Sequence, residues 1–455
     1  MVSWDKRHGE ILLDLVSAFN KADIKYFILR NYEKLPNENT SKDVDIIIEP
    51  SKIKVANIII QQVYKQHNLT HEYLVRFTWV YCWHGMDIKN HLSIHIDLIA
   101  GYRMKGYEVF SFDELYQQTM EYNGFRVLNR YYEGLMVFIY KQFGYKNPPL
   151  KQEYKDIIYA TCSNNTKFIT DLQTIVGRPL AHNIISAIEK KDFDGMLSYS
   201  QQLTAKLKKF SFKKDPIGVL LRIINFYWLK FQRIVLCRNK YGKTFSVMAP
   251  DGAGKSTFLE SLLDDLSFYF TKDRSFFTLL HFRPEILPNL GAVGEKAGVM
   301  KQDKNFTTPH RAKPAGFLSS LVRITYYWCD YVIGWFIYTS KDIQHDRFTV
   351  FDRYSYDLLV DPRRTRLGLP YWVRKLYVVL MPQPKFTFYL DVDPEEIFRR
   401  KQELAPDEIN RQVDEYRKLV KTSKRFIDLN GNRPVEQIKD DAIKCILDRF
   451  CTKLK

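Results

Sequence analysis

The sequence predicts an α/β protein, with a parallel sheet flanked by helices in its C-terminal part, an α+β domain at its N-terminus and a mainly helical region between them. Near residue 250, an apolar strand runs through a glycine-bearing loop into a helix. Strand-like and helix-like patterns alternate before residue 110, and apolar residues at three- and four-residue spacing dominate from 111 to about 240. These observations divide the chain into three parts, 1–110, 111–241 and 242–455.

The composition narrows the classes of partner. The chain has 455 residues, of which 45% are apolar and 27% charged, as is typical of globular proteins with real cores. Its formal net charge of +17 admits nucleic acid, an anionic membrane or phosphorylated small molecules as partners. Because the basic residues are scattered and form no long tail, nucleic acid is disfavoured as the main partner.

Cysteine usage and apolar runs indicate a cytoplasmic protein. The six cysteines form no Cys-x-x-Cys pair and no His cluster completes a zinc site with them, so we expect free thiols in a reducing compartment. The N-terminus lacks a signal-peptide core, and no run of 18 apolar residues predicts a spanning helix. The most apolar segment, Tyr326–Tyr338, contains Asp330 and predicts a buried core helix. The lysine-rich segment Lys206–Lys214 favours a solvated linker face, with contact to a membrane surface as the alternative.

Four segments justify the N-terminal α+β domain. Glu10–Lys21 carries apolar residues on one helical face. Lys25–Leu29 and Val44–Ile48 have the pattern of short strands, and Leu92–Ile99 alternates clearly. We therefore expect a small sheet with helices packed against it.

The segment around residue 250 has the context of a Walker A loop. Thr244–Met248 predicts a strand and Thr257–Leu266 a helix, with a glycine-bearing loop and Lys-Ser-Thr between them. The residues predicted to bind ATP phosphates are Ala249, Pro250, Gly252, Ala253, Gly254, Lys255, Ser256 and Thr257. Backbone N–H groups of such a loop attract phosphate, Lys255 reaches the outer phosphates and the Ser256 hydroxyl can ligate Mg²⁺. Ala249 stands where the first glycine is usual, which requires a φ below zero there.

From about residue 242 to 450 the sequence resembles the thymidylate kinase family of nucleoside monophosphate kinases, on Asp251 to Thr257 above all. The resemblance implies that Asp251 contacts the acceptor, and that Arg283, just after the expected strand Phe276–His281, grips the acceptor phosphate. A further strand, Phe348–Phe351, is followed by Asp352-Arg353-Tyr354. The resemblance implies that Asp352 holds Mg²⁺ through water and that Arg353 clamps phosphate.

The resemblance also implies an arginine-bearing lid beyond the expected strand Lys385–Leu390. Arg399 and Arg400 occupy that region and are the catalytic candidates. The alternative is that this basic run is a solvated helix face.

The acceptor stays open because the expected acceptor wall departs from the family. Pro284–Pro288 replaces a Glu-Pro-Gly-Gly turn, and the run after Tyr354 brings two extra arginines, Arg363 and Arg364. We expect ATP·Mg²⁺ as donor and a nucleoside monophosphate, such as dTMP, or another small phosphorylated or sugar-like acceptor.

Three aspartates mark a second candidate site. Asp43 and Asp45 share one strand face, and Asp97 follows on a later strand. Converging carboxylates bind divalent metal. Over about residues 8–110 this pattern resembles the nucleotidyltransferase superfamily, although Leu29–Tyr32 replaces its Gly-Ser turn and leaves Arg30 to grip a triphosphate. The alternative is an Asp pair that solubilises a strand edge, with Asp97 as a surface residue.

Three functions follow from these patterns. The first is a thymidylate kinase-like phosphotransferase. The second is a bifunctional nucleotidyltransferase and kinase that acts on a sugar or polysaccharide precursor. The third is a non-enzymatic scaffold that binds nucleotide, which the departures at Ala249 and at the missing Gly-Ser turn would favour.

Overall fold

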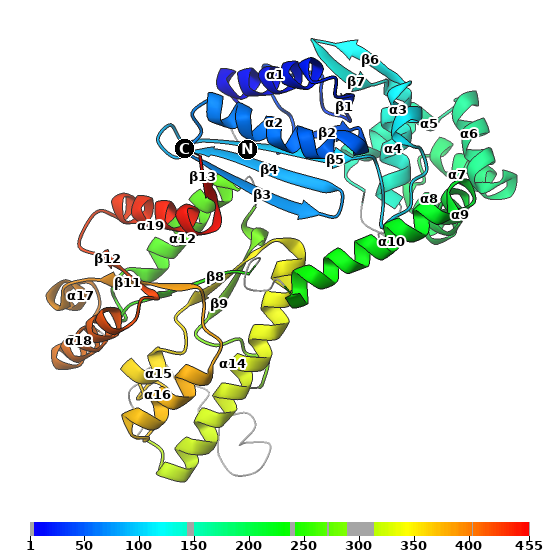
Figure 1. Cartoon of the computed structure of the whole chain (residues 1–455). Coiled ribbons are helices and arrows are strands. Elements are labelled where there is room, and N and C mark those ends of the chain that lie inside the picture. Colours follow the sequence, from blue (N-terminus) through cyan, green and yellow to red (C-terminus); the bar gives the residue numbers. More distant parts are fainter. Residues whose placement is uncertain are drawn as a thin grey trace. The chain divides into compact units, whose positions relative to one another are not determined.

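The computed structural model describes residues 4–142, 150–236, 242–270, 273–288, 314–402 and 404–454 (Figure 1). They form two compact units: an N-terminal unit of Met1–Phe231 with Cys451–Lys455, and a C-terminal unit of Gln232–Phe450. The predicted boundary at residue 241 lies outside the described residues. Both units combine helices with a sheet, so the predicted α/β class is confirmed.

The N-terminal unit is built on one mixed sheet of eight strands in the order β13-β3-β4-β5-β2-β1-β7-β6. Its strands are β1 (Tyr26–Ile28), β2 (Val44–Ile48), β3 (His71–Phe77), β4 (Val80–Asp87), β5 (Leu92–Ala100), β6 (Thr119–Tyr122), β7 (Phe125–Leu128) and β13 (Thr452–Lys453). β2 and β5 run parallel, whereas β4 pairs with β5 antiparallel. β5 therefore lies between a parallel and an antiparallel neighbour.

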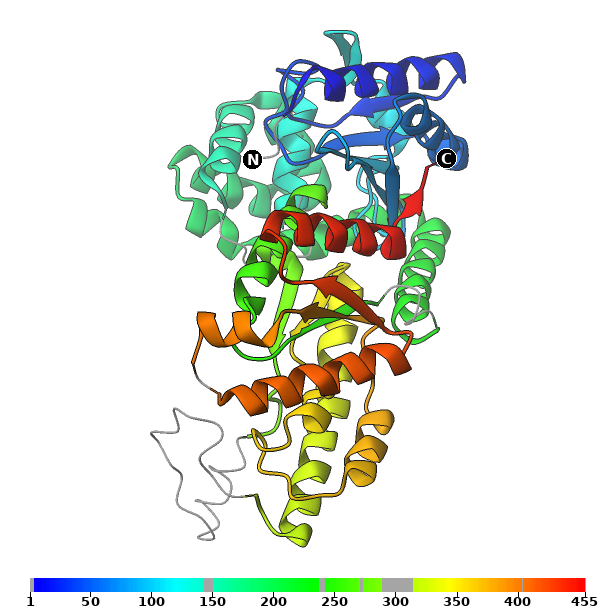
Figure 2. The same cartoon turned by 90° about the vertical axis from the view of Figure 1, so that its left-hand side faces the viewer.

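Helices cover both faces of this sheet. Figure 2 shows α1 (Lys6–Lys21) and α2 (Ile53–Gln66) together on one face, where their apolar side chains pack with those of β1, β2 and β5. The helices of the other face share a core with Phe27, Ile47 and Ile99. The remaining helical segments of this unit are η1 (Pro50–Lys52), α3 (Phe112–Tyr116), α4 (Arg130–Gln142), α5 (Gln152–Cys162), α6 (Thr166–Val176), α7 (Arg178–Glu189), α8 (Phe193–Ser198), α9 (Ser200–Lys214) and α10 (Pro216–Phe231).

The middle of the chain is mainly helical, as expected, but one expectation within it needs correction. The region expected to be mainly helical also contains the hairpin β6–β7, which extends the sheet because β7 pairs with β1. The segment Lys206–Lys214 is the second half of α9, and its Leu207 and Ser211 are buried, so it is not a solvated linker. Lysines alternate there with the residues that face the core.

The C-terminal unit has a five-stranded, entirely parallel sheet in the order β12-β11-β8-β10-β9, as expected for this part of the chain. Its strands are β8 (Lys243–Met248), β9 (Phe277–His281), β10 (Phe348–Asp352), β11 (Phe386–Asp391) and β12 (Phe426–Asn430). Its helical segments are η2 (Gln232–Leu236), α12 (Lys255–Tyr269), η3 (Arg274–Phe276), α14 (Phe317–His345), α15 (Asp357–Val360), α16 (Tyr371–Leu380), α17 (Pro394–Arg400), α18 (Pro406–Thr422) and α19 (Val435–Phe450). Figure 1 shows α12 and α19 together on one face of the sheet and α14 on the other.

The apolar segment Tyr326–Tyr338 lies within α14 and is only half buried. Asp330 and Tyr331 are buried against the sheet, whereas Phe336 and Ile337 are about half exposed. A single helix beside a sheet buries one stripe, so the expected buried core helix packs into the core along that stripe and is exposed on its other side. Among the described residues, no helix combines the length and the apolarity that crossing a membrane requires.

Candidate functional site

The loop after β8 has the backbone that phosphate binding requires. All six residues of β8 are buried, and α12 begins at Lys255 directly after the loop. Gly252 and Gly254 adopt left-handed φ angles of 88° and 83°, which glycine tolerates best. Ala249 is not among the residues with positive φ, so the substitution for the usual glycine is accommodated without strain. The loop and the start of α12 therefore present their N–H groups together.

A pocket of about 340 Å³ opens at this loop. It is lined by Pro250, Asp251, Gly252, Gly254, Lys255, Ser256, Thr257, Arg400 and Lys401. The two alanines of the loop, Ala249 and Ala253, are buried. Most residues predicted to hold nucleotide phosphates thus border one cavity.

The two lid candidates differ in position. Arg400 lines the pocket and lies 3.4 Å from the carbonyl oxygen of Ala253. Arg399 is 78% exposed, is paired with Glu396 and does not line the pocket. The structure therefore brings only one of the two arginines to the loop.

Asp352, at the end of β10, meets the loop lysine. Its Oδ1 accepts a hydrogen bond from Lys255 Nζ, and its Oδ2 lies 2.9 Å from His281 Nδ1. Burial raises the pKa of Asp352, but hydrogen bonds and charge from His281 and Lys255 outweigh it and lower this pKa to about 2. Burial, helped by the charge of Arg353, lowers the pKa of Lys255. Asp352 is therefore ionised near neutral pH, beside the loop that follows β8.

Asp251, inside the loop, is held by two arginines. Arg353 Nη2 donates to its Oδ1 at 2.6 Å, and Arg364 donates to its Oδ2. Burial raises the pKa of Asp251, but the two guanidinium charges outweigh it and lower this pKa. Arg364 also pairs with Asp361 at 3.3 Å.

Arg353 is nearly enclosed by protein. It is 2% exposed, has a left-handed φ of 71°, and also donates to Asp357 at 2.8 Å. Such a backbone conformation is costly for a residue other than glycine and persists only where the surrounding structure holds it. Tyr416 donates to the other oxygen of Asp357 at 2.5 Å, which fixes that carboxylate.

Arg283 lies beyond β9 and is oriented by α14. Its guanidinium lies 3.4 Å from Asp330 and 5.5 Å from the ring centre of Tyr327. Asp330 also accepts hydrogen bonds from the backbone N–H groups of Glu285 and Leu287, at 3.1 and 2.7 Å. The carboxylate in the apolar run of α14 therefore anchors the loop that carries Arg283.

Three features of the site were not predicted from the sequence: the position of His281, the role of Asp330, and the contact of Arg364 with Asp251. Asp330 had a signal, since a fully buried carboxylate within an apolar helix needs partners. His281 is the last residue of β9, and parallel strands end at one edge, so its meeting with Asp352 followed from the strand order. The contact of Arg364 had no local signal, because 113 positions separate it from Asp251.

The three aspartates of the N-terminal unit do converge. One carboxylate oxygen from each of Asp43, Asp45 and Asp97 lies within 4.8 Å of the others, on β2 and β5 and the residue preceding β2. Arg30 pairs with Asp45 at 2.9 Å, and Ser41 donates to Asp43 at 2.9 Å. Burial raises the pKa of Asp45 to about 6, and the carboxylates of Asp43 and Asp97 add to this effect while Arg30 opposes it. This aspartate group therefore carries excess negative charge.

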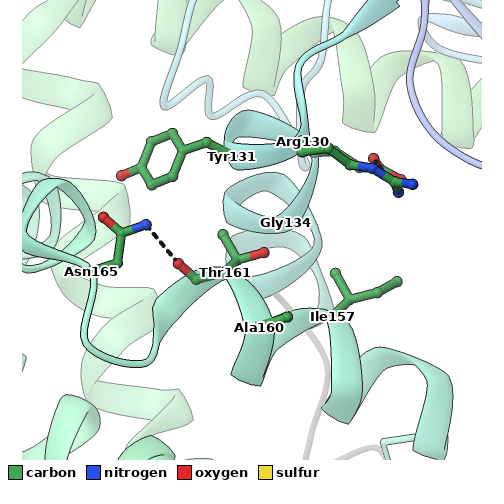
Figure 3. Close-up of a pocket in the computed structure, with 8 residues that line it drawn as sticks. Arg130, Tyr131, Gly134, Ile157, Ala160, Thr161 and Asn165 are labelled. Atoms are coloured by element: carbon green, nitrogen blue, oxygen red, sulfur yellow. Dashed lines mark hydrogen bonds and ion pairs between the residues drawn. The ribbon is translucent and has the colours of Figure 1, made fainter.

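A separate pocket of about 380 Å³ lies in the helical layer of the N-terminal unit. Figure 3 shows Arg130, Tyr131 and Gly134 of α4 facing Ile157, Ala160 and Thr161 of α5, with Asn165 hydrogen-bonded to the Thr161 carbonyl. None of the predicted site residues lines this pocket.

Comparison with known proteins identifies no family. No protein-family model matches the chain, and neither does any curated protein. Among solved structures, the chain is similar to thymidylate kinase from Ehrlichia chaffeensis, with 15% sequence identity and a TM-score of 0.29 over 45% of this chain and 98% of that one. At these values the likeness adds nothing to the geometry of the site.

Proposed function

We propose that the C-terminal unit is an ATP- and Mg²⁺-dependent small-molecule kinase that transfers the γ-phosphoryl group to a phosphorylated acceptor. One observation carries the proposal: the glycine-bearing loop after β8 holds a carboxylate, Asp251, which contacts Arg353 just after the end of the neighbouring strand β10. Asp251 thereby links the loop proposed to bind the donor with Arg353, which is proposed to bind the acceptor.

The donor side uses the loop and its lysine. N–H groups of the loop and of the start of α12 bind the phosphates, and Lys255 neutralises the outer ones. Ser256 lines the pocket and is the candidate Mg²⁺ ligand, with Asp352 holding the ion through water. Bound Mg²⁺ supplies charge neutralisation at the transferring phosphoryl group. Lys255 exchanges its contact with Asp352 for phosphate when the nucleotide binds.

The acceptor side is arginine-rich. Arg353 and Arg364 converge on Asp251. Arg283, which follows the end of β9, is oriented by Asp330. Guanidinium groups bind phosphate in a bidentate manner, so these residues fit an acceptor that carries an anionic phosphate. A nucleoside monophosphate such as dTMP and a sugar phosphate both satisfy this chemistry.

An acceptor screen tests the proposal. Full-length protein with ATP·Mg²⁺ is offered nucleoside monophosphates, nucleosides, sugars and sugar phosphates, and products are read by mass. We expect phosphoryl transfer to at least one phosphorylated acceptor, loss of transfer in Lys255→Ala, and no loss in Lys444→Ala, an exposed lysine of α19. Undiminished transfer by Lys255→Ala would refute the kinase, and ATP binding without any transfer would favour the scaffold.

A second function is supported by the convergence of the aspartate group within 4.8 Å. We infer that this group holds a divalent cation for metal-dependent nucleotidyl transfer, with Arg30 as the nearby cation for a triphosphate. Asp43→Asn/Asp45→Asn should remove Mg²⁺-dependent nucleotide binding by the N-terminal unit and spare the kinase. Binding that survives this double substitution, measured in a Lys255→Ala background, would rule the second function out.

A further inference from the structure

One row of side chains crosses three strands of the N-terminal sheet. Asp45 on β2 is paired with Asp97 on β5, and Asp97 is paired with Cys82 on β4. Two positions further along β4 and β5, and so on the same face of the sheet, His84 is paired with His95. Because paired residues project from the same face, all five side chains lie on the face opposite α1 and α2.

This row changes in chemical character from one end to the other. At the end near β2, the potential metal ligands are the carboxylate oxygens of the aspartate group. The end at β4 adds a thiol and imidazoles, and Cys82, His84 and His95 are each less than 9% exposed. His84 and His95 stack with ring centres 4.0 Å apart, which fixes the orientation of both rings.

Three different ligand types converge at the inner end. One ligand atom from each of Cys82, His95 and Asp97 lies within 4.8 Å of the other two. A tetrahedral zinc site with one sulfur, one nitrogen and one oxygen ligand needs separations of about 3.3–3.6 Å, so shifts of roughly 1 Å would close it. His95 Nε2 is hydrogen-bonded to Asp97 Oδ1 at 2.9 Å, a contact that a bound ion would replace.

We infer that Cys82, His95 and Asp97 form a second cation site, for a borderline transition metal such as Zn²⁺, that shares Asp97 with the aspartate group. Thiolate and imidazole select such ions over Mg²⁺, which prefers oxygen ligands and octahedral geometry. Three protein ligands leave a fourth position for water or for a group of a bound substrate. The two ends of the row would thus take different ions. The inference does not depend on the kinase, because all three ligands belong to the N-terminal unit.

Cobalt substitution in the reduced full-length protein tests this site. Co²⁺ bound by Cys82 should give the charge-transfer absorption of a cobalt–thiolate bond, and Zn²⁺ should abolish that absorption. Cys82→Ser should lose the absorption, and His95→Gln should bind Co²⁺ at least about tenfold more weakly. Asp97→Asn should weaken both Co²⁺ at this site and Mg²⁺ at the aspartate group.

Matched controls separate this site from other thiols and from misfolding. Cys445→Ser removes a thiol from the C-terminal unit and Asp43→Asn removes a carboxylate outside the trio, so both should keep the absorption. Absorption that persists in Cys82→Ser, or that never forms in the parent protein, would overturn the inference. If Cys82→Ser loses its circular dichroism signal, His95→Gln decides, since it keeps the thiol: unchanged Co²⁺ affinity in a folded His95→Gln protein would refute the site.

Discussion

The phosphate loop region and the aspartate group bury carboxylates in opposite electrostatic settings. At the phosphate loop, Lys255 and His281 lower the pKa of Asp352 to about 2 against the effect of burial. In the aspartate group, burial and two neighbouring carboxylates raise the pKa of Asp45 to about 6 against the effect of Arg30. The first region has positively charged side chains that an anionic ligand could contact. The second has excess negative charge that a bound cation would neutralise. Burial alone therefore does not decide what a carboxylate binds.

Removing a buried cation from the phosphate loop region should have the largest effect. Arg353→Met leaves Asp251 and Asp357 without their shared partner and should lower the free energy of unfolding of the C-terminal unit by about 3–5 kcal/mol. Chemical denaturation measures this change. Arg433→Met removes an exposed pair with Asp441 and should cost less than about 1 kcal/mol. Equal losses in the two variants would mean that Arg353 is not an essential counter-ion.

The aspartate group should show the next largest effect, as a dependence on pH. The folded-state pKa of Asp45, about 6, lies above its unfolded value of about 3.9. Its contribution to stability is therefore full below pH 4 and is lost as the pH rises through 6, by about 2–3 kcal/mol without divalent cation. Asp45→Asn should flatten this dependence, as measured by hydrogen exchange of β2 and β5 in EDTA at pH 4.5 and 7.5.

The exposed carboxyl of Glu121 in β6 provides the control for this pH experiment. Glu121→Gln should leave the pH dependence unchanged, and Mg²⁺ should restore stability at pH 7.5 in the parent protein but not in Asp45→Asn. A pH dependence that is identical in Asp45→Asn and the parent protein would show that another group is responsible.

On the acceptor side, Arg364→Ala should lower kcat/KM for the acceptor by about 10–100-fold, since one charged hydrogen-bonding group contributes roughly 1.5–3 kcal/mol. The KM for ATP should change little, because Arg364 contacts Asp251 and does not line the loop pocket. Steady-state kinetics with each substrate varied in turn separates the two effects. A raised KM for ATP with an unchanged kcat/KM for the acceptor would place Arg364 on the donor side instead.

The two lid candidates should give the smallest effects, and they should differ. Arg400→Ala should slow ATP turnover by about tenfold, or 1.4 kcal/mol, because Arg400 lines the loop pocket. Arg399→Ala should change turnover by less than about twofold, since this side chain is exposed and paired with Glu396. Equal effects of the two substitutions would show that the helix end rearranges when nucleotide binds.

Much of the phosphate loop region could be predicted because its determinants are local. Strand, loop and helix follow one another within 27 positions, Lys243 to Tyr269, and the loop keeps its left-handed glycines. The positions of Asp352 and Arg353 could also be predicted, because residues at the carboxyl ends of parallel strands meet at one edge of the sheet. That Arg400 lines the loop pocket and Arg399 does not could not be predicted, since this depends on which side of α17 faces the loop.

The sequence by itself determined the α/β class, the parallel C-terminal sheet and the strand, loop and helix around residue 250, because short-range periodicity and a contiguous motif encode them. Only the tertiary structure decided that Arg364 holds Asp251 and that Cys82 stands beside Asp97. The cysteine and histidine spacing argued against a zinc site, but spacing reports only ligands that are near in sequence. The antiparallel register of β4 on β5 brings these distant residues together, and that register is set by side-chain packing across the whole sheet.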